Sequence, residues 1–89
     1  MTFRKRRGIN LSYEQQGYIA FTCWTYERQS EEIQHKILNL CTECGGEHRA
    51  ALFDVMTRND MSVTQVSMKH HVSESLIYNM RKSFYESWE

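Results

Sequence analysis

The amino-acid sequence predicts an all-α protein, a small helical bundle that carries a basic N-terminal arm. Three observations favour helices over strands: the chain has no proline, it has few runs of β-branched residues, and its apolar residues recur at helical spacing. The chain has 89 residues, of which 40% are hydrophobic, so we expect one ordered domain with a modest core. A large barrel or doubly wound sheet is excluded because such folds need a much longer chain.

The chain divides into an arm and a helical domain. We expect residues 1–11 to form a flexible basic arm and residues 12–89 to form the domain, with a helix or helix pair over 12–44 and a second unit over 47–89. The formal net charge is zero, but the arm holds four basic residues and no acid. A local basic patch suffices to contact phosphate, so the neutral total does not exclude nucleic acid.

The first helix is predicted to begin after Ser12, because Ser12 and Gln15 have the spacing of a capping box. The apolar positions that follow recur in steps of four and three, and Ser30 fills the one missing place. Because Ser30 could also cap a second helix, residues 13–43 form either one long helix or two helices that meet near 29–30. Gly45 and Gly46 end the helix in both cases. The apolar stripe consists of Ile19, Cys23, Tyr26, Ile33, Ile37, Leu40 and Cys44.

Two partners fit this apolar stripe. It could pair with the same stripe of a second copy and make a homodimer. Alternatively it packs on the helix predicted over 47–58 and completes a single core, since a chain this short needs all its apolar residues. That helix carries Ala51, Leu52, Val55 and Met56 on one side, and a turn at Asn59 and Asp60 follows it.

The last third of the chain has the pattern of two short helices joined by a tight turn. Ser62 and Gln65 form a second capping box and begin a helix that runs to about His70. Ser73 caps the last helix. Its inward positions are predicted to be Leu76, Ile77, Met80 and Phe84.

Within this segment, Ser67 is small where the two helices would touch, and Val72 is a branched apolar residue that follows the turn. The segment resembles the helix-turn-helix of insertion-sequence transposases and of related mobile-element and phage regulators, and more distantly region 4 of sigma factors. It departs from that pattern at His71, where glycine is usual, and at Met80, where tryptophan is common. The matching residues are Val66, Ser67, Val72, Ser73, Ser75, Leu76, Ile77, Tyr78, Arg81, Lys82 and Phe84.

The resemblance implies a tri-helical unit that binds double-stranded DNA in a sequence-directed way, with the helix that starts near Glu74 in the major groove. The expected base contacts are Ser75, Tyr78, Asn79 and Lys82, of which Asn79 could bond adenine. The expected phosphate contacts in this unit are Thr64, Lys69 and Arg81. The composition of the arm adds Arg4, Lys5, Arg6 and Arg7, which could follow the minor groove.

Cys41, Cys44 and His48 have the spacing C-x2-C-x3-H and are weak candidates for zinc ligands. A fourth ligand would have to come from far along the chain, and Cys44 already belongs to the apolar stripe. We therefore expect buried structural thiols, no metal and no cofactor. We also expect no enzyme, because the sequence has no nucleophile–base set, phosphate loop or paired-carboxylate signature.

The sequence favours a small transcriptional regulator or accessory factor of a phage or mobile element, with double-stranded DNA as its partner. The alternative is a helical protein-interaction module, such as a phage-type inhibitor or adaptor, that uses the hairpin only as a scaffold. Its acidic middle would then bind a basic protein that the sequence does not identify. With no apolar run long enough for a membrane span, no secretory signal and three cysteines, we expect a cytoplasmic protein.

Overall fold

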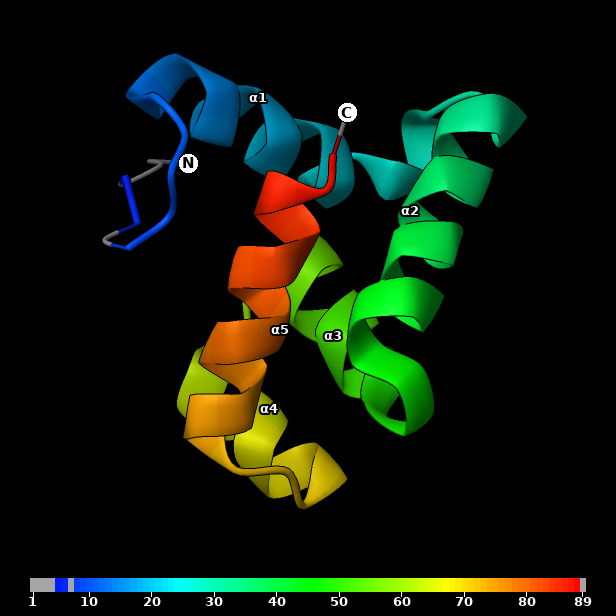
Figure 1. Cartoon of the computed structure of the whole chain (residues 1–89). Helices are drawn as coiled ribbons and strands as arrows, with labels where there is room; N and C mark the ends of the chain where they lie inside the picture. Colours follow the sequence, from blue (N-terminus) through cyan, green and yellow to red (C-terminus); the bar gives the residue numbers. More distant parts are fainter. Residues whose placement is uncertain (1–4, 7, 89) are drawn as a thin grey trace.

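The structure is a computed structural model that describes residues 5, 6 and 8–88 (Figure 1). All regular structure in these residues is helical, and no strand occurs among them, which confirms the predicted all-α class. Short 3₁₀ turns at Tyr26–Arg28 and Gly46–His48 connect the first three helices. The α-helices are α1 (Tyr13–Trp24), α2 (Glu31–Gly45), α3 (Arg49–Thr57), α4 (Val63–His70) and α5 (Glu74–Glu86).

Serine side chains mark where four of these helices begin. The Ser12 hydroxyl accepts a hydrogen bond from the Gln15 N–H, and the Gln15 side chain accepts one from the Ser12 N–H at 2.9 Å. The same reciprocal pair forms between Ser62 and Gln65. Both predicted capping boxes are therefore confirmed. The other two caps are Ser30, at the start of α2, and Ser73, at the start of α5.

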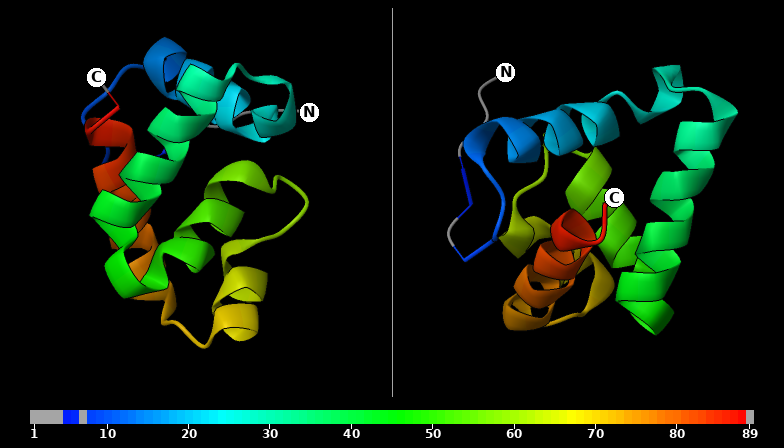
Figure 2. Two further views of the ribbon diagram at one scale, coloured as in Figure 1. Left: turned by 90° about the vertical axis from the view of Figure 1, so that its right-hand side faces the viewer. Right: turned by 45° about the horizontal axis from the view of Figure 1, so that its top comes forward.

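The cap at Ser30 decides between one long N-terminal helix and two. Helix α1 ends at Trp24 and α2 begins anew at Glu31, so the two-helix alternative is correct. The two helices run in different directions (Figure 2). At the other end of α2, Gly46 has a positive φ of 55°, a conformation that costs little without a Cβ. Gly45 and Gly46 thus end the helix as predicted.

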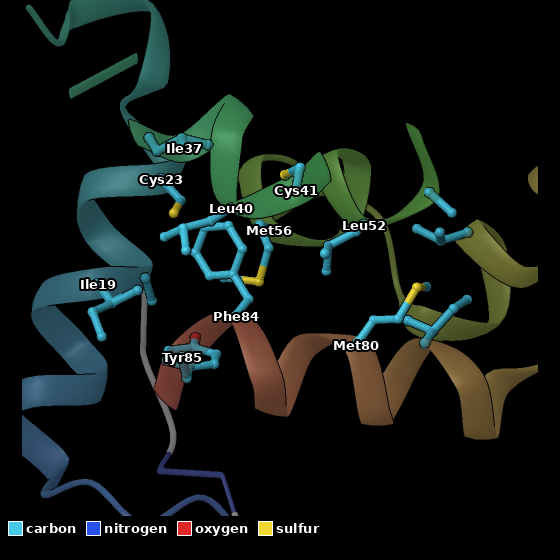
Figure 3. Packing of buried hydrophobic residues seen from close by; sticks show 14 of the residues in the cluster. Ile19, Cys23, Ile37, Leu40, Cys41, Leu52, Met56, Met80, Phe84 and Tyr85 are labelled. Carbon is cyan, nitrogen blue, oxygen red and sulfur yellow. The ribbon is translucent and has the colours of Figure 1, made fainter. Parts of the chain in front are cut away.

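Helix α3 is the centre of the packing and contacts α1, α2, α4 and α5. Its Leu52 is fully buried. Figure 3 shows Phe84 of α5, which is also fully buried, beside Leu40 of α2 and Met56 of α3. The radius of gyration is 12.0 Å. A compact chain of this length has about the same value, ~12 Å, so the helices share one core.

The apolar stripe lies inside this core. Ile19 and Cys23 of α1 and Ile37 and Leu40 of α2 are buried in one cluster with residues of α3 and α5 (Figure 3). Tyr26, Ile33 and Cys44 pack against it from the edge. The structure therefore supports the single-core alternative, and this stripe is not free to pair two copies.

Part of the predicted flexible arm packs on the helices. Ile9 is only 8% exposed and belongs to the core cluster. The Gln16 side chain is fully buried in α1, accepts a hydrogen bond from the Arg6 N–H at 2.7 Å, and donates one to the Leu11 carbonyl at 3.1 Å. The prediction of a flexible arm over 1–11 needs correction for residues 6 and 8–11, because a buried amide and an apolar side chain hold this segment in place.

Helix α5 buries three of the four residues predicted to face inward, Ile77, Met80 and Phe84, but not the fourth, Leu76. Its buried residues repeat at the spacing of one helix face, from Ile77 to Tyr85. Leu76 is 37% exposed, because it lies one residue, or about 100°, away from that face. Arg81, predicted as a surface contact, lies on the buried face instead.

Candidate nucleic-acid interface

Helices α4 and α5 are joined by the turn His71–Ser73. The Ser67 hydroxyl donates to the Val72 carbonyl at 2.6 Å, and the Val72 N–H donates to the Ser67 carbonyl at 3.2 Å. The Val72 side chain is buried. Ser67 thus lies where the two helices meet, and Val72 is buried after the turn, as the sequence predicted.

His71 takes the left-handed conformation that the turn requires, with φ of 56° and ψ of 45°. This is the position where glycine is usual in the resembled pattern. A Cβ in this conformation costs about 1–2 kcal/mol, and His tolerates it better than most residues. His71 therefore supplies the left-handed residue of this turn without a glycine.

The four predicted base-contacting side chains share one face of α5. They recur at positions i, i+3, i+4 and i+7, the spacing of a single helical stripe. All four are exposed, as is Glu74 at the start of the helix. These residues are Ser75, Tyr78, Asn79 and Lys82. The structure brings them together on a continuous polar surface of hydroxyl, amide and ammonium groups.

The predicted phosphate contacts Thr64 and Lys69 are exposed on α4, but each already has a partner. The Thr64 hydroxyl donates to the Glu74 carboxylate at 3.1 Å and so links the starts of α4 and α5. Lys69 Nζ lies 3.0 Å from Asp54 Oδ2 of α3, and His70 Nε2 lies 2.7 Å from the same oxygen. The Thr64 hydroxyl would have to give up Glu74 to donate to a phosphate, whereas the Lys69 ammonium has two further N–H donors.

Asp54 anchors α4 to α3, a role that no sequence pattern indicated. Burial raises the pKa of the Asp54 carboxyl, but hydrogen bonds and charge from His70 and Lys69 outweigh this and hold the pKa below its usual range. The carboxylate is therefore ionised at neutral pH and keeps the end of α4 against α3.

Arg81 is 8% exposed and points away from the outward face of α5. Its guanidinium lies 5.1 Å from the centre of the Tyr78 ring. Burial lowers the pKa of Arg81, and the positive charge of Arg6 lowers it further. Arg81 can therefore reach a phosphate only through the pocket into which its side chain is packed.

That pocket has a volume of about 640 Å³ and is lined by three arginines, Arg6, Arg58 and Arg81. Ser62 and Thr64 at the start of α4 and Tyr78 of α5 also line it. Sequence reasoning missed the pocket because these arginines are distant in the chain. The sequence did hold one signal that Arg81 is buried. Arg81 follows Ile77 by four residues and precedes Phe84 by three, which places it on the same helix face as these two residues.

Of the predicted arm contacts, Lys5 is exposed and Arg6 lines the pocket, with Nε buried and without a hydrogen-bond partner. Arg4 and Arg7 lie outside the described residues. Of the predicted phosphate contacts that the structure describes, Arg6, Thr64 and Arg81 line this one pocket. Lys5 and Lys69 are exposed outside its lining.

The cysteines belong to the interior or its edge. Cys23 and Cys41 are buried and Cys44 is half-buried, and all three thiols are free. Burial, with a smaller effect of Cys44, raises the pKa of Cys41 to about 12, so its thiolate is not populated at neutral pH. In the described part of the chain, no three His, Cys, Asp or Glu side chains come together to hold a metal ion, so Cys41, Cys44 and His48 do not form a ligand set there.

No family model, curated protein or solved structure matches this chain. None of the helices within residues 5–6 and 8–88 is both long and apolar enough to span a membrane. The fold and the candidate interface therefore carry the functional inference by themselves.

Proposed function

We propose that this chain is a sequence-directed DNA-binding protein that places α5 in the major groove, and that it acts as a small transcriptional regulator or accessory factor. The observation that carries the proposal is the outward face of α5. It is exposed along its length, it is polar, and it stands beside α4 in a tri-helical unit with α3. The major groove, about 12 Å wide, admits one helix with such a face.

Each exposed side chain of this face has chemistry that suits a base edge. The Asn79 amide can donate an N–H to adenine N7 while its oxygen accepts from the adenine N6 amino group, and this bidentate contact distinguishes adenine. Lys82 can bond the acceptors of guanine, and Tyr78 can pack on a thymine methyl group. Ser75 lies in the first turn of α5, where a hydroxyl can reach a base or a phosphate.

The charges of the other faces favour the same orientation. Helix α2 presents three exposed carboxylates, Glu31, Glu32 and Glu43, and DNA would be repelled there. Lys5, Lys69 and Lys82 are exposed cations. DNA on the α5 side would lie near Lys82 of α5 and Lys69 of α4, with the exposed Glu74 and Glu86 at the two ends of α5, while the three carboxylates of α2 belong to another helix.

A homodimer remains a prediction that fits palindromic DNA sites. The apolar stripe cannot supply its interface, because that stripe is buried in the core. Large exposed apolar side chains are found on α1, among them Tyr18 and Phe21, which are 62% and 59% exposed. A dimer would need another apolar surface of this kind.

The test is selection of bound sequences from random duplex DNA at moderate salt, followed by affinity measurements on the selected site. Asn79→Ala should lower affinity about 5–150-fold, the equivalent of about 1–3 kcal/mol for a lost bidentate base contact, with an unchanged melting temperature. Asn39→Ala is the matched control, because Asn39 is an exposed asparagine on α2. The proposal fails if no sequence is enriched, or if the two variants bind DNA equally well.

A further inference from the structure

The pocket between the N-terminal segment, the start of α4 and α5 is unusually rich in positive charge. Arg6, Arg58 and Arg81 line it, and among the described residues no carboxylate does. The three come from the N-terminal segment, the end of α3 and the buried face of α5. Folding therefore gathers three guanidinium groups from separate parts of the chain into one pocket.

Two of these arginines lack a counter-charge in the described part of the protein. Arg81 is more than nine-tenths buried and forms no ion pair or hydrogen bond with a described side chain. Arg6 Nε is buried with no hydrogen-bond partner. The two like charges also repel, which is one cause of the lowered pKa of Arg81. A buried, unpaired cation is unfavourable unless an anion completes it.

The remaining lining groups suit the same anion. Ser62 and Val63 bring the N-terminus of α4 to the pocket wall, where the helix dipole and free N–H groups favour negative charge. Tyr78 adds a hydroxyl group, whereas the Thr64 hydroxyl at the same wall already donates to Glu74. Oxyanion binding at a helix N-terminus is reinforced here by arginines, whose planar donor forks match phosphate oxygens.

Two nearby acids limit this charge without cancelling it. Asp60 accepts two hydrogen bonds from Arg58, both 3.1 Å long, so Arg58 is partly neutralised. Glu74 accepts from Thr64 at 3.1 Å. Neither acid forms an ion pair with Arg6 or Arg81. The Arg6 side chain hydrogen-bonds Tyr85, whose phenol carries no charge at neutral pH because burial raises its pKa, so both cations lack a counter-charge among the described residues.

We propose that this pocket is a phosphate-binding site, formed by Arg81 and Arg6 with the start of α4. The phosphate could belong to a free organic phosphate or to the backbone of bound DNA, and only the second case rests on the proposed function. In that case the pocket fixes the position of α5 in the groove, because Tyr78 belongs to both the pocket and the outward face.

The first arm of the test uses free phosphates. Calorimetric titration with inorganic phosphate and with adenosine monophosphate, in chloride buffer, should give saturable binding to the wild type. Arg81→Gln and Arg6→Gln should weaken it at least tenfold. Arg49→Gln should leave it unchanged, since Arg49 is an exposed arginine at the opposite end of α3 from Arg58. Circular dichroism checks folding, and Arg6→Gln keeps the test decisive if Arg81→Gln does not fold.

The second arm uses the selected DNA duplex. If the phosphate is that of DNA, Arg81→Gln and Arg6→Gln should lower affinity for all sequences alike and reduce the salt slope by about 0.9 for the lost contact. Free-phosphate binding without any DNA binding would support the pocket and refute the proposed function. DNA binding that depends on Asn79 but not on Arg81 or Arg6, together with no free-phosphate binding, would overturn the pocket alone.

Discussion

Helices α2 and α5 both begin at a serine cap, both pack on α3, and they pack on each other. Their two faces nevertheless differ. The buried residues of α2 are all apolar, namely Ile37, Leu40 and Cys41, and its exposed residues include three glutamates. Helix α5 buries a guanidinium, Arg81, among its apolar residues, and it exposes an amide, hydroxyls and one lysine beside two glutamates, Glu74 and Glu86.

The difference separates residues that packing explains from residues that it does not. Every buried residue of α2 gains stability from burial, and an acidic outer face keeps such a helix solvated. Arg81 loses hydration on folding and gains no described ion pair, so packing alone does not account for it. A residue whose burial is unfavourable is a candidate for function, and in this chain it belongs to the helix that also carries the exposed polar stripe.

The largest expected effect tests whether α5 contributes to the core as α2 does. Phe84→Ala should lower the free energy of unfolding by about 3–5 kcal/mol, because it leaves a cavity where a fully buried ring lies among Leu40 and Met56. Leu76→Ala on the same helix is the control and should cost far less, since Leu76 is 37% exposed. Urea denaturation measures both. Equal losses of unfolding free energy in the two variants would mean that α5 does not bury the face described here.

The next largest effect is a gain in stability, and it tests the contrast between the buried Arg81 of α5 and the apolar buried residues of α2. Arg81→Met should raise the free energy of unfolding by about 1–2 kcal/mol, because an unpaired buried charge is replaced by an apolar side chain of similar length. No replacement of Ile37 in α2 should stabilise the protein, since that position is already apolar and fully buried. Thermal melts in phosphate-free buffer check this. A less stable Arg81→Met variant would show that the guanidinium is satisfied within the protein.

How much of this arrangement the sequence predicts depends on the range of the interactions. The serine caps Ser12, Ser62 and Ser73 and the end at Gly45 were predictable, because each rests on residues within one helical turn. The choice at Ser30 stayed open until packing decided it. Docking of Ile9 and Arg6, and the gathering of Arg58 and Arg81 in one pocket, depend on contacts between distant segments, and no local spacing encodes them.

The outward face of α5 was predictable for the same reason. Ser75, Tyr78, Asn79 and Lys82 follow from one cap and one helical period. Leu76 and Arg81 were placed on the wrong faces, because the matched pattern concerned residue types and not the register of the buried face. The periodicity from Ile77 to Phe84 carried the correct register.

The smallest expected effect concerns the contacts that hold the α4–α5 unit and α2 in the fold. Acid should weaken the first set of contacts more than the second. Helix α4 is tied to α3 through the carboxylate of Asp54, whereas the buried face of α2 has no carboxylate. Because the folded-state pKa of Asp54 is below its ordinary 3.8, its contribution to stability is fully present above that value and is lost as the pH falls through the folded-state pKa.

The free energy of unfolding of the wild type should therefore exceed that of Asp54→Asn by about 0.2–1 kcal/mol near neutral pH, and the difference should shrink below about pH 4. Urea denaturation from pH 7 to pH 3 measures it, and amide hydrogen exchange shows where it acts. Protection should fall first in α4, which loses its bonds from Lys69 and His70, and later in α2. An equal difference at every pH would show that Asp54 acts through packing instead of through its charge.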